Sequence, residues 1–180
     1  MSATHETIKH KALPFLLSGF IIAADQLVKG FIVTHWTGNR ILDVFGNDVL
    51  WIIHVRNKAI AFSLGHNLPD TLRPFLFIIL PIGVIIGLIL GYYCKSREIS
   101  PLQRWLFAGI IGGGLGNILD RIFRPDGVVD FISIKFYGLF GMERWPTFNI
   151  ADASVVVCCI IFFVSSLISP KSSALESPVE

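Results

Sequence analysis

The chain has 180 residues, of which 53% are hydrophobic with its 16 glycines left out of that share, and 16% are charged. A soluble domain is about 25% charged and about 45–50% apolar with glycine included, so this composition argues against an ordinary cytosolic globule and excludes a disordered chain. The net charge is +2 and the 15 Lys and Arg residues are scattered, so the sequence indicates no nucleic-acid partner.

Four apolar stretches follow one another along the chain, each near the length that crosses about 30 Å of hydrocarbon at about 1.5 Å per residue. They cover about 13–33, 75–93, 105–123 and 151–168. The sequence therefore predicts an all-α membrane protein, a four-transmembrane-helix bundle formed by a single domain over residues 1–180. The polar tail at about 171–180 is expected to be disordered.

The first stretch has a second interpretation, a cleaved signal peptide, because Lys9 and Lys11 precede an apolar run that ends at Ala23 and Ala24. The position three before such a cut is Ile22, which is not a small residue, and apolar residues resume afterwards. We therefore expect an uncleaved first helix.

An even number of spans places both termini on one side of the membrane. The longer connections, about 34–74 and 124–150, carry Lys and Arg more thinly for their length than the segments on the side of the termini. The positive-inside rule then predicts cytoplasmic termini. The basic residues on that side are Lys9, Lys11, Lys95, Arg97, Arg104 and Lys171.

The first long connection contains more than a linker. β-favouring side chains gather over residues 41–64, with a turn at Gly46, Asn47 and Asp48, which predicts a small extracytoplasmic β-sheet. Pro69 and Asp70 open a segment, residues 67–74, that is typical of a short interfacial helix.

Several polar and small residues within the predicted spans need an explanation, because ionisable groups are costly in a membrane. Asp25 and Lys29 are four residues apart and can pair on one helix face. The third span brings Asn117, Asp120 and Arg121 onto a common face, where they can satisfy one another or handle a substrate. Its glycines have the spacing of close helix contacts: Gly109, Gly112, Gly113, Gly114 and Gly116.

Two further carboxylates flank the connection between the third and fourth spans. Asp130 lies in an apolar segment just beyond the third span, and Asp152 lies at the start of the fourth. A turn residue and a helix-terminal carboxylate are the structural alternatives. Because the two helices are expected to pack as neighbours, however, both carboxylates fall at one membrane face. A close pair of carboxylates in which one keeps its proton is the chemistry of an aspartic protease.

Other catalytic classes find less support in the sequence. The five histidines form no H-x-x-x-H or H-E-x-x-H motif, and no G-x-S-x-G occurs. The glycine-rich run of the third span lacks the Gly-Lys-Ser/Thr of a phosphate loop. Cys94, Cys158 and Cys159 have neither metal-ligand nor disulfide spacing. We therefore expect no metal and no organic cofactor.

Five motifs in order resemble those of the bacterial lipoprotein signal peptidase (type II signal peptidase) family. They are Asp25-Gln26-Leu27-Val28-Lys29, Arg56-Asn57-Lys58-Ala59-Ile60-Ala61-Phe62-Ser63, Gly113-Gly114-Leu115-Gly116-Asn117-Ile118-Leu119-Asp120-Arg121, Val128-Val129-Asp130-Phe131 and Phe148-Asn149-Ile150-Ala151-Asp152. The second motif departs from the family pattern, since Ala59 and Ile60 stand where Gly and Ala are usual.

The resemblance implies an intramembrane aspartic endopeptidase of the bacterial inner membrane, with its active site near the extracytoplasmic face. Its substrates would be prolipoproteins, which it would cut on the N-terminal side of a diacylglyceryl-modified cysteine. We expect the enzyme to contact membrane lipids and to be a monomer. The catalytic pair falls on Asp130 and Asp152. The surrounding residues that bind substrate or support the pair fall on Asn57, Asn117, Asp120, Arg121, Asn149, Asp25 and Lys29. We expect Asn57 to hydrogen-bond the substrate backbone, in a groove roofed by residues 41–74.

A small four-helix channel or carrier is the alternative function. Asp25, Lys29, Asp120 and Arg121 would supply its polar path. A path that continues toward the cytoplasm needs more polar groups, and the second span has none in residues 78–83.

Overall fold

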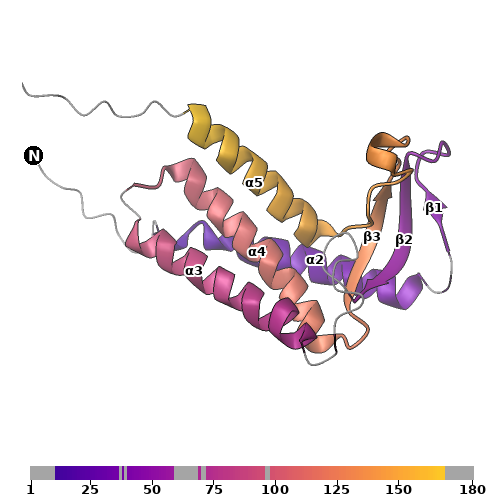
Figure 1. The fold of residues 1–180 in the computed structure, drawn as a ribbon, viewed down its shortest axis with the longest axis horizontal. Helices are drawn as coiled ribbons and strands as arrows, with labels where there is room; N and C mark the ends of the chain where they lie inside the picture. Colours follow the sequence, from indigo (N-terminus) through magenta and orange to yellow (C-terminus); the bar gives the residue numbers. More distant parts are fainter. Residues whose placement is uncertain are drawn as a thin grey trace, which may run out of the picture.

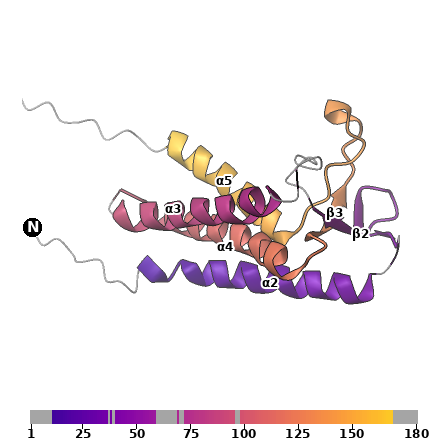
Figure 2. The same ribbon diagram turned by 60° about the horizontal axis from the view of Figure 1, so that its bottom comes forward.

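The computed structural model describes residues 11–36, 38, 40–58, 69, 72–95 and 98–168. Four long helices pack into a bundle, and a small sheet extends from one end of it (Figures 1 and 2). Helix α2 begins, and helix α5 ends, at the other end of the bundle (Figure 1). The sheet and the helix ends beside it therefore form one distinct end of the molecule.

All four predicted spans are helical, and each is long and apolar enough to cross a membrane. The helices are α2 (Phe15–His35), η2 with α3 (Phe75–Ile79 and Leu80–Cys94), α4 (Pro101–Phe123) and α5 (Ile150–Ile168). Helix α4 begins four residues before its apolar run, because Ser100 and Gln103 form a reciprocal capping box there. The fold-class prediction is thus confirmed.

Helix α4 is the central helix of the bundle and packs against α2, α3 and α5. Its glycines permit this close packing, as the sequence predicted. A Cβ on Gly112 would lie 2.7 Å from the Cα of Ser18 in α2. A Cβ on Gly113 would overlap the carbonyl oxygen of Ala151 in α5. The backbones of α2, α4 and α5 therefore approach one another closely at these glycines.

The sheet is antiparallel, with strand order β1-β2-β3. Strands β1 (Leu42–Asp43) and β2 (Leu50–Asn57) form the predicted hairpin, whose turn is held by Asp43: its carboxylate accepts the N–H groups of Gly46 (3.0 Å) and Asp48 (2.8 Å). Three predicted segments lie outside the described residues. They are residues 59–64 of the predicted sheet region, most of the predicted interfacial helix at 67–74, and the tail at 171–180.

Strand β3 (Val128–Ile134) was not predicted, and it joins the sheet to the bundle. Its Val129 and Phe131 are buried against Ile32 and Trp36 at the end of α2. The strand also pairs with the chain before α5, since the Phe148 carbonyl accepts the N–H groups of Phe131 (3.0 Å) and Ile132 (2.8 Å). Asp130 is therefore held between two anchored residues, beside the start of α5.

The close approach of α4 and α5 predicts that Gly113→Ala destabilises the protein, because the added methyl group has no space against a backbone carbonyl. Overpacking of this kind costs about 1–3 kcal/mol. The matched control is Gly87→Ala in the middle of α3, where a Cβ would meet nothing within 4 Å. That control should be neutral or stabilising by up to about 1 kcal/mol. Thermal unfolding in detergent measures both, and equal effects would contradict the packing.

Candidate active site

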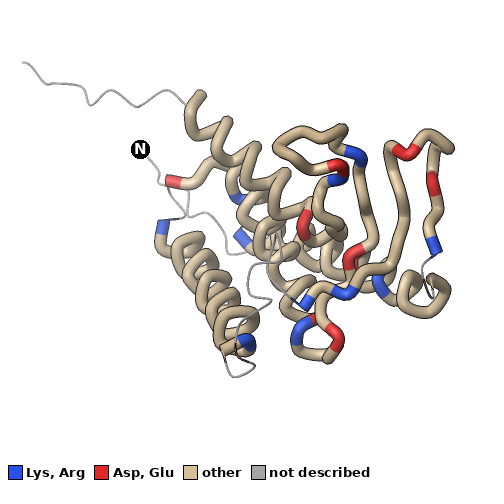
Figure 3. The backbone as a smooth tube through the Cα atoms, turned by 45° about the vertical axis from the view of Figure 1, so that its right-hand side comes forward, with Lys and Arg blue, Asp and Glu red and all other residues tan. Residues whose placement is uncertain are grey.

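Asp130 and Asp152 line one cavity of about 590 Å³ between α4, α5 and β3. Asn57, Asn117 and Arg121 contribute its other polar groups. Apolar side chains form much of the remaining wall, including those of Val128, Phe148, Val155, Val156 and Val157. The cavity lies where the helices meet the sheet, the region in which charged residues gather in Figure 3. The two carboxylates expected to converge therefore face a common space.

Asn149 joins these two carboxylates. Its side-chain Nδ2 donates to Oδ1 of Asp130 at 2.7 Å, and its backbone N–H donates to Oδ2 of Asp152 at 3.2 Å. Its own Oδ1 accepts the backbone N–H of Asp152 at 2.9 Å, as in a helix N-terminal cap. Asn149 is fully buried, so its orientation is constrained from all sides. One residue thus sets the relative position of both acids.

Asp130 is the more deeply buried of the two acids, with 2% of its surface exposed. Burial raises the pKa of its carboxyl group to about 6, because desolvation penalises the charged form. Asn57 Nδ2 donates a hydrogen bond to Asp130 at 2.9 Å, which stabilises the carboxylate and lowers the pKa of Asp130. The negative charge of Asp152 raises that pKa further. Asp130 therefore keeps its proton to a higher pH than an ordinary aspartate.

Asp152 lies in the first turn of α5 and is half-buried. The N-terminal end of a helix carries a partial positive charge, which stabilises a carboxylate at this position. Asn117 from α4 donates its Nδ2 to Oδ1 of Asp152 at 2.7 Å. Its other amide atom, Oδ1, accepts from Lys29 Nζ at 3.0 Å and from Asn149 Nδ2 at 3.1 Å. These bonds fix which end of the Asn117 amide faces Asp152.

Lys29 is fully buried and forms ion pairs with two fully buried carboxylates, Asp25 at 2.7 Å and Asp120 at 3.0 Å. The predicted pairing of Asp25 with Lys29 is confirmed. Asp25 Oδ1 also accepts the backbone N–H of Ala151 at 3.0 Å, and Asp120 Oδ2 accepts that of Val129 at 3.0 Å. Each of these carboxylates therefore holds the residue immediately before one of the two cavity-lining acids.

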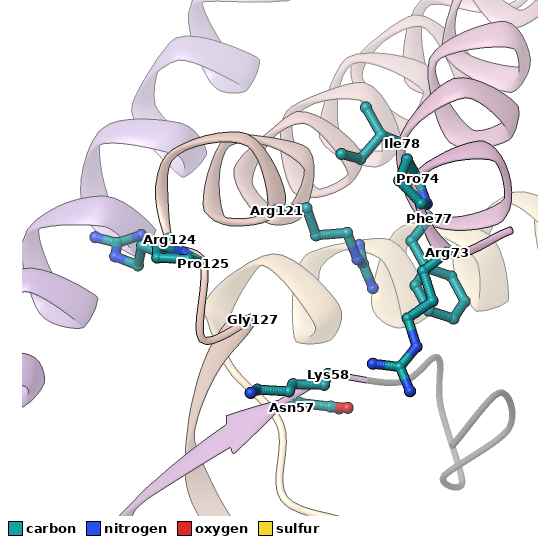
Figure 4. Close-up of a pocket in the computed structure, with 10 residues that line it drawn as sticks. All are labelled: Asn57, Lys58, Arg73, Pro74, Phe77, Ile78, Arg121, Arg124, Pro125 and Gly127. Atoms are coloured by element: carbon teal, nitrogen blue, oxygen red, sulfur yellow. The ribbon is translucent and has the colours of Figure 1, made fainter. Parts of the chain in front are cut away.

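Asp120 and Arg121, expected on one helix face where they could satisfy one another, do not pair. Asp120 instead pairs with Lys29 from α2 and with Arg124, one turn further along the chain. Arg121 forms no ion pair with a described residue; its guanidinium lies 5.9 Å from the ring of Phe77 and lines the cavity. The geometric reason is that Asp120 contacts Lys29 of α2, whereas the Arg121 side chain points toward Phe77 of η2 (Figure 4).

Gln26 and Arg124, for which no role was expected, take part in the same cluster. Gln26 Nε2 donates to Oδ1 of Asp120 at 2.9 Å and to the carbonyl oxygen of Gly116 at 3.0 Å. Arg124 Nη1 donates to Oε1 of Gln26 at 2.8 Å and pairs with Asp120. A polar Gln inside an apolar span, and an Arg four residues after a buried Asp, are the signals that could have found them.

A second cavity of about 240 Å³ adjoins the first and is drawn in Figure 4. Asn57 and Arg121 line both cavities. The other lining residues of the second are Lys58, Arg73, Pro74, Phe77, Ile78, Arg124, Pro125 and Gly127. Among the described residues, no group of three His, Cys, Asp or Glu side chains has an arrangement that could hold a metal ion.

Comparison with known proteins matches the chain along most of its length. A family model of the peptidase A8 family, described as signal peptidase (SPase) II, matches residues 17–168. The lipoprotein signal peptidase of Treponema pallidum is 42% identical over 167 residues, which cover 91% of this chain and 87% of the relative. That of Treponema denticola is 48% identical over 147 residues, 82% of this chain and 83% of the relative.

The fold also matches solved structures. A bacterial membrane enzyme determined by the in meso method at 2.3 Å resolution superimposes with a TM-score of 0.73 and 26% identity. The match covers 94% of this chain and 95% of that one. A second such structure, at 1.9 Å, has a TM-score of 0.72 and covers 88% and 95% of the two chains.

The buried ion pairs predict that Lys29→Met strongly destabilises the protein, because Asp25 loses its cation while it stays fully buried. Breaking a buried pair in this way costs about 3–5 kcal/mol. Changing Asp25 to Asn in the same protein removes the unpaired charge and should recover part of the loss. The control is Arg121→Leu, which breaks no ion pair with a described residue. Thermal unfolding should rank Lys29→Met well below Arg121→Leu, and the reverse order would contradict this account.

Proposed function

The chain belongs to the signal peptidase II family, and we propose that it removes signal peptides from diacylglyceryl-modified prolipoproteins with Asp130 and Asp152 as an aspartic catalytic pair. Family membership makes it a membrane peptidase of lipoprotein processing. The observation that carries the aspartic mechanism is the double hydrogen bonding of Asn149 to both carboxylates inside one cavity. The cut is proposed on the N-terminal side of the lipidated cysteine.

We assign the proton to Asp130 and the negative charge to Asp152. Asp130 is almost fully enclosed, and its pKa is raised to about 6 chiefly by desolvation. Asp152 is more exposed, and the α5 N-terminus and the Asn117 amide both favour its carboxylate form. Two neighbouring carboxyl groups in different environments are thereby driven to opposite protonation states.

The chemistry follows from that asymmetry. Asp152 accepts a proton from a water molecule as the water oxygen attacks the scissile carbonyl carbon. Asp130 donates its proton to the carbonyl oxygen, so the tetrahedral intermediate carries no full negative charge. When the intermediate collapses, the proton on Asp152 passes to the leaving amine and the proton of the intermediate's hydroxyl returns to Asp130. The pair is then restored, and no metal or organic cofactor takes part in this scheme.

Asn57 supports Asp130 in this proposal. Its Nδ2 donates a hydrogen bond to Oδ2 of Asp130 at 2.9 Å, so Asn57 orients the carboxyl group of Asp130. The expectation that it bonds the substrate backbone stays a prediction. Arg121 lines the same cavity without an ion pair to a described residue, which makes it available to a substrate carbonyl.

The proposed substrate fits the position of the cavity at the helix ends. A diacylglyceryl chain residing in the bilayer would hold its cysteine at the membrane surface, and bilayer residence itself supplies much of the binding. The apolar wall of the cavity, with Val155 and Val156 on α5, suits the apolar part of a signal peptide. We place the sheet on the extracytoplasmic side of the inner membrane and the termini in the cytoplasm; a monomeric state remains a prediction.

The alternative of a channel or carrier finds no supporting observation. Asp25, Lys29 and Asp120 are fully buried and bonded to one another, so they form a closed cluster. Their hydrogen bonds to Ala151 and Val129 tie that cluster to the proposed catalytic pair.

We expect Asp130→Asn and Asp152→Asn each to lower the cleavage rate by at least about a thousandfold, because an amide keeps the shape of the acid but cannot exchange its proton. The assay uses a diacylglyceryl-modified precursor and the same precursor without lipid, and follows product by mass. Both variants should elute and unfold like the unchanged protein. Near-normal cleavage by either variant would overturn the aspartic pair. Equal cleavage of the two precursors by the unchanged enzyme would overturn the lipoprotein-specific substrate but not the pair.

The pH dependence of kcat/KM tests the assignment of the proton. Because Asp130 must be protonated and its pKa is about 6, kcat/KM should fall as pH rises past about 6. Asn57→Ala removes a donor that stabilises the charged form, so it should raise the pKa of Asp130 and move this alkaline limb to higher pH. An alkaline limb that stays in place or moves to lower pH in Asn57→Ala would contradict the assignment.

A further inference from the structure

We propose that the hairpin between β3 and α5, residues 135–145, anchors the protein in the interfacial layer of the membrane beside α5. The aromatic side chains of its tip, residues 136–142, insert between the lipid headgroups. This inference goes beyond the proposed peptidase activity and does not depend on it.

The tip of the hairpin is uncharged, and its large side chains are exposed. The sequence from Phe136 to Met142 contains no Asp, Glu, Lys or Arg. Phe140 is 82% exposed, Tyr137 69% and Leu139 54%, so the described residues leave this surface uncovered. A cluster of exposed apolar side chains marks an interaction site, and aromatic residues with leucine are typical of segments that lie where a membrane meets water.

The backbone of the hairpin holds these side chains in their exposed position. The Phe136 N–H donates to the carbonyl oxygen of Glu143 at 2.8 Å, and the short helix η3 (Leu139–Gly141) forms the end of the tip. Tyr137 (φ 52°) and Phe140 (φ 53°) adopt the left-handed conformation, which bulky residues rarely do. Strain of this kind persists at functional segments, and here it displays two aromatic rings to the surroundings.

The basic residues of the hairpin lie against the sheet and leave the tip apolar. The Arg144 guanidinium lies 3.6 Å from the centre of the Trp51 ring and donates to the carbonyl oxygen of Asp48 at 2.7 Å. Lys135 Nζ lies 4.0 Å from the carboxylate of Asp48. Glu143 is exposed at the base of the hairpin. An apolar tip on a charged base is the arrangement of an interfacial anchor.

The tip lies beside the end of the bundle, at the level where the spans leave the membrane. It contains the short orange helical turn above β3 in Figure 1. Along the bundle, this turn falls between the start of α5 and the end of α2 (Figures 1 and 2). Both of these helices are candidate membrane spans. The headgroup layer around the two helix ends therefore reaches the tip.

An apolar surface connects the tip to the outside of α5. The rings of Phe136 and Trp145 lie 5.0 Å apart, centre to centre. Trp145 in turn lines the larger cavity together with Val156 and Val157 of α5, and both valines are more than half exposed. Because the exposed face of a membrane span is covered by lipid, this continuity favours the bilayer as the occupant of the tip. The anchor then holds the Trp145 wall of the cavity at the lipid surface.

A fluorescent label at the tip tests this anchor without any assay of activity. The full chain, with Cys94, Cys158 and Cys159 replaced by Ala, carries the environment-sensitive fluorophore NBD on one new cysteine and is reconstituted in phosphatidylcholine vesicles. Phe140→Cys places the label at the tip. The matched control is Asn47→Cys in the exposed turn between β1 and β2. Thermal unfolding of both labelled proteins checks that they keep the fold.

The readout is quenching by lipids that carry a nitroxide near the top of the acyl chain. We expect these lipids to quench the Phe140→Cys label at least about fivefold more than the Asn47→Cys label, because an interfacial anchor inserts by about 5–10 Å. Equal quenching of the two labels would overturn the anchor. A blue-shifted Phe140→Cys label that the nitroxide lipids do not quench would show that protein covers the tip, and would overturn the bilayer as its occupant.

A second pair of variants tests whether the side chains of the tip cause the insertion. Adding Tyr137→Ser and Leu139→Ser to the labelled Phe140→Cys protein should weaken the quenching at least about threefold, since insertion scales with the apolar area buried. The control adds Val44→Ser and Phe45→Ser, which remove exposed apolar side chains from the other hairpin and should leave the quenching unchanged. Equal effects of the two pairs would overturn the role of the tip.

Discussion

The rest of the structure depends on the ion pairs of the buried Lys29 ammonium group. It pairs with Asp25 on its own helix and with Asp120 on α4, and each carboxylate has a second oxygen that accepts a backbone N–H from a different element. Those N–H groups belong to Ala151 and Val129, which immediately precede Asp152 and Asp130. One cation, itself far too costly to bury alone, thus fixes the two segments that carry the proposed catalytic acids.

The same cluster explains how a membrane bundle can hold a polar site without being destabilised by it. The polar groups of the cluster have hydrogen-bond or ion-pair partners. Gln26 bridges Asp120 and Arg124, and Asn117 connects the cluster to Asp152 by a hydrogen bond. The glycines of α4 bring the helices close enough for these short contacts. Packing and electrostatics therefore depend on each other, because a wider helix separation would leave buried charges without partners.

The sheet is responsible for the chemical difference between the two acids. Strand β3 encloses Asp130 between buried apolar neighbours, whereas the first turn of α5 leaves Asp152 partly exposed at a helix N-terminus. Two identical side chains thereby acquire different environments. Asn149, placed by the pairing of Phe148 with β3, holds them in register with each other. Arg121 and Asn57 line both this cavity and the second, smaller cavity beside it, so the two cavities share a wall.

The sequence alone determined the features that depend on local spacing. Apolar runs of membrane length predicted the four helices, glycines at helical spacing predicted the packing face of α4, and a four-residue interval predicted the Asp25–Lys29 pair. The two acids and their polar neighbours were recognised as candidates by residue type and by resemblance. Only the tertiary structure decided their partners. Asp120 pairs with Lys29 and Arg124 rather than Arg121, strand β3 forms through pairing with residues more than 70 positions away, and Asn149 bridges both acids. Periodicity specifies which residues share a face of one element, but the partner across the gap is set by how separate elements pack, and that information is not local.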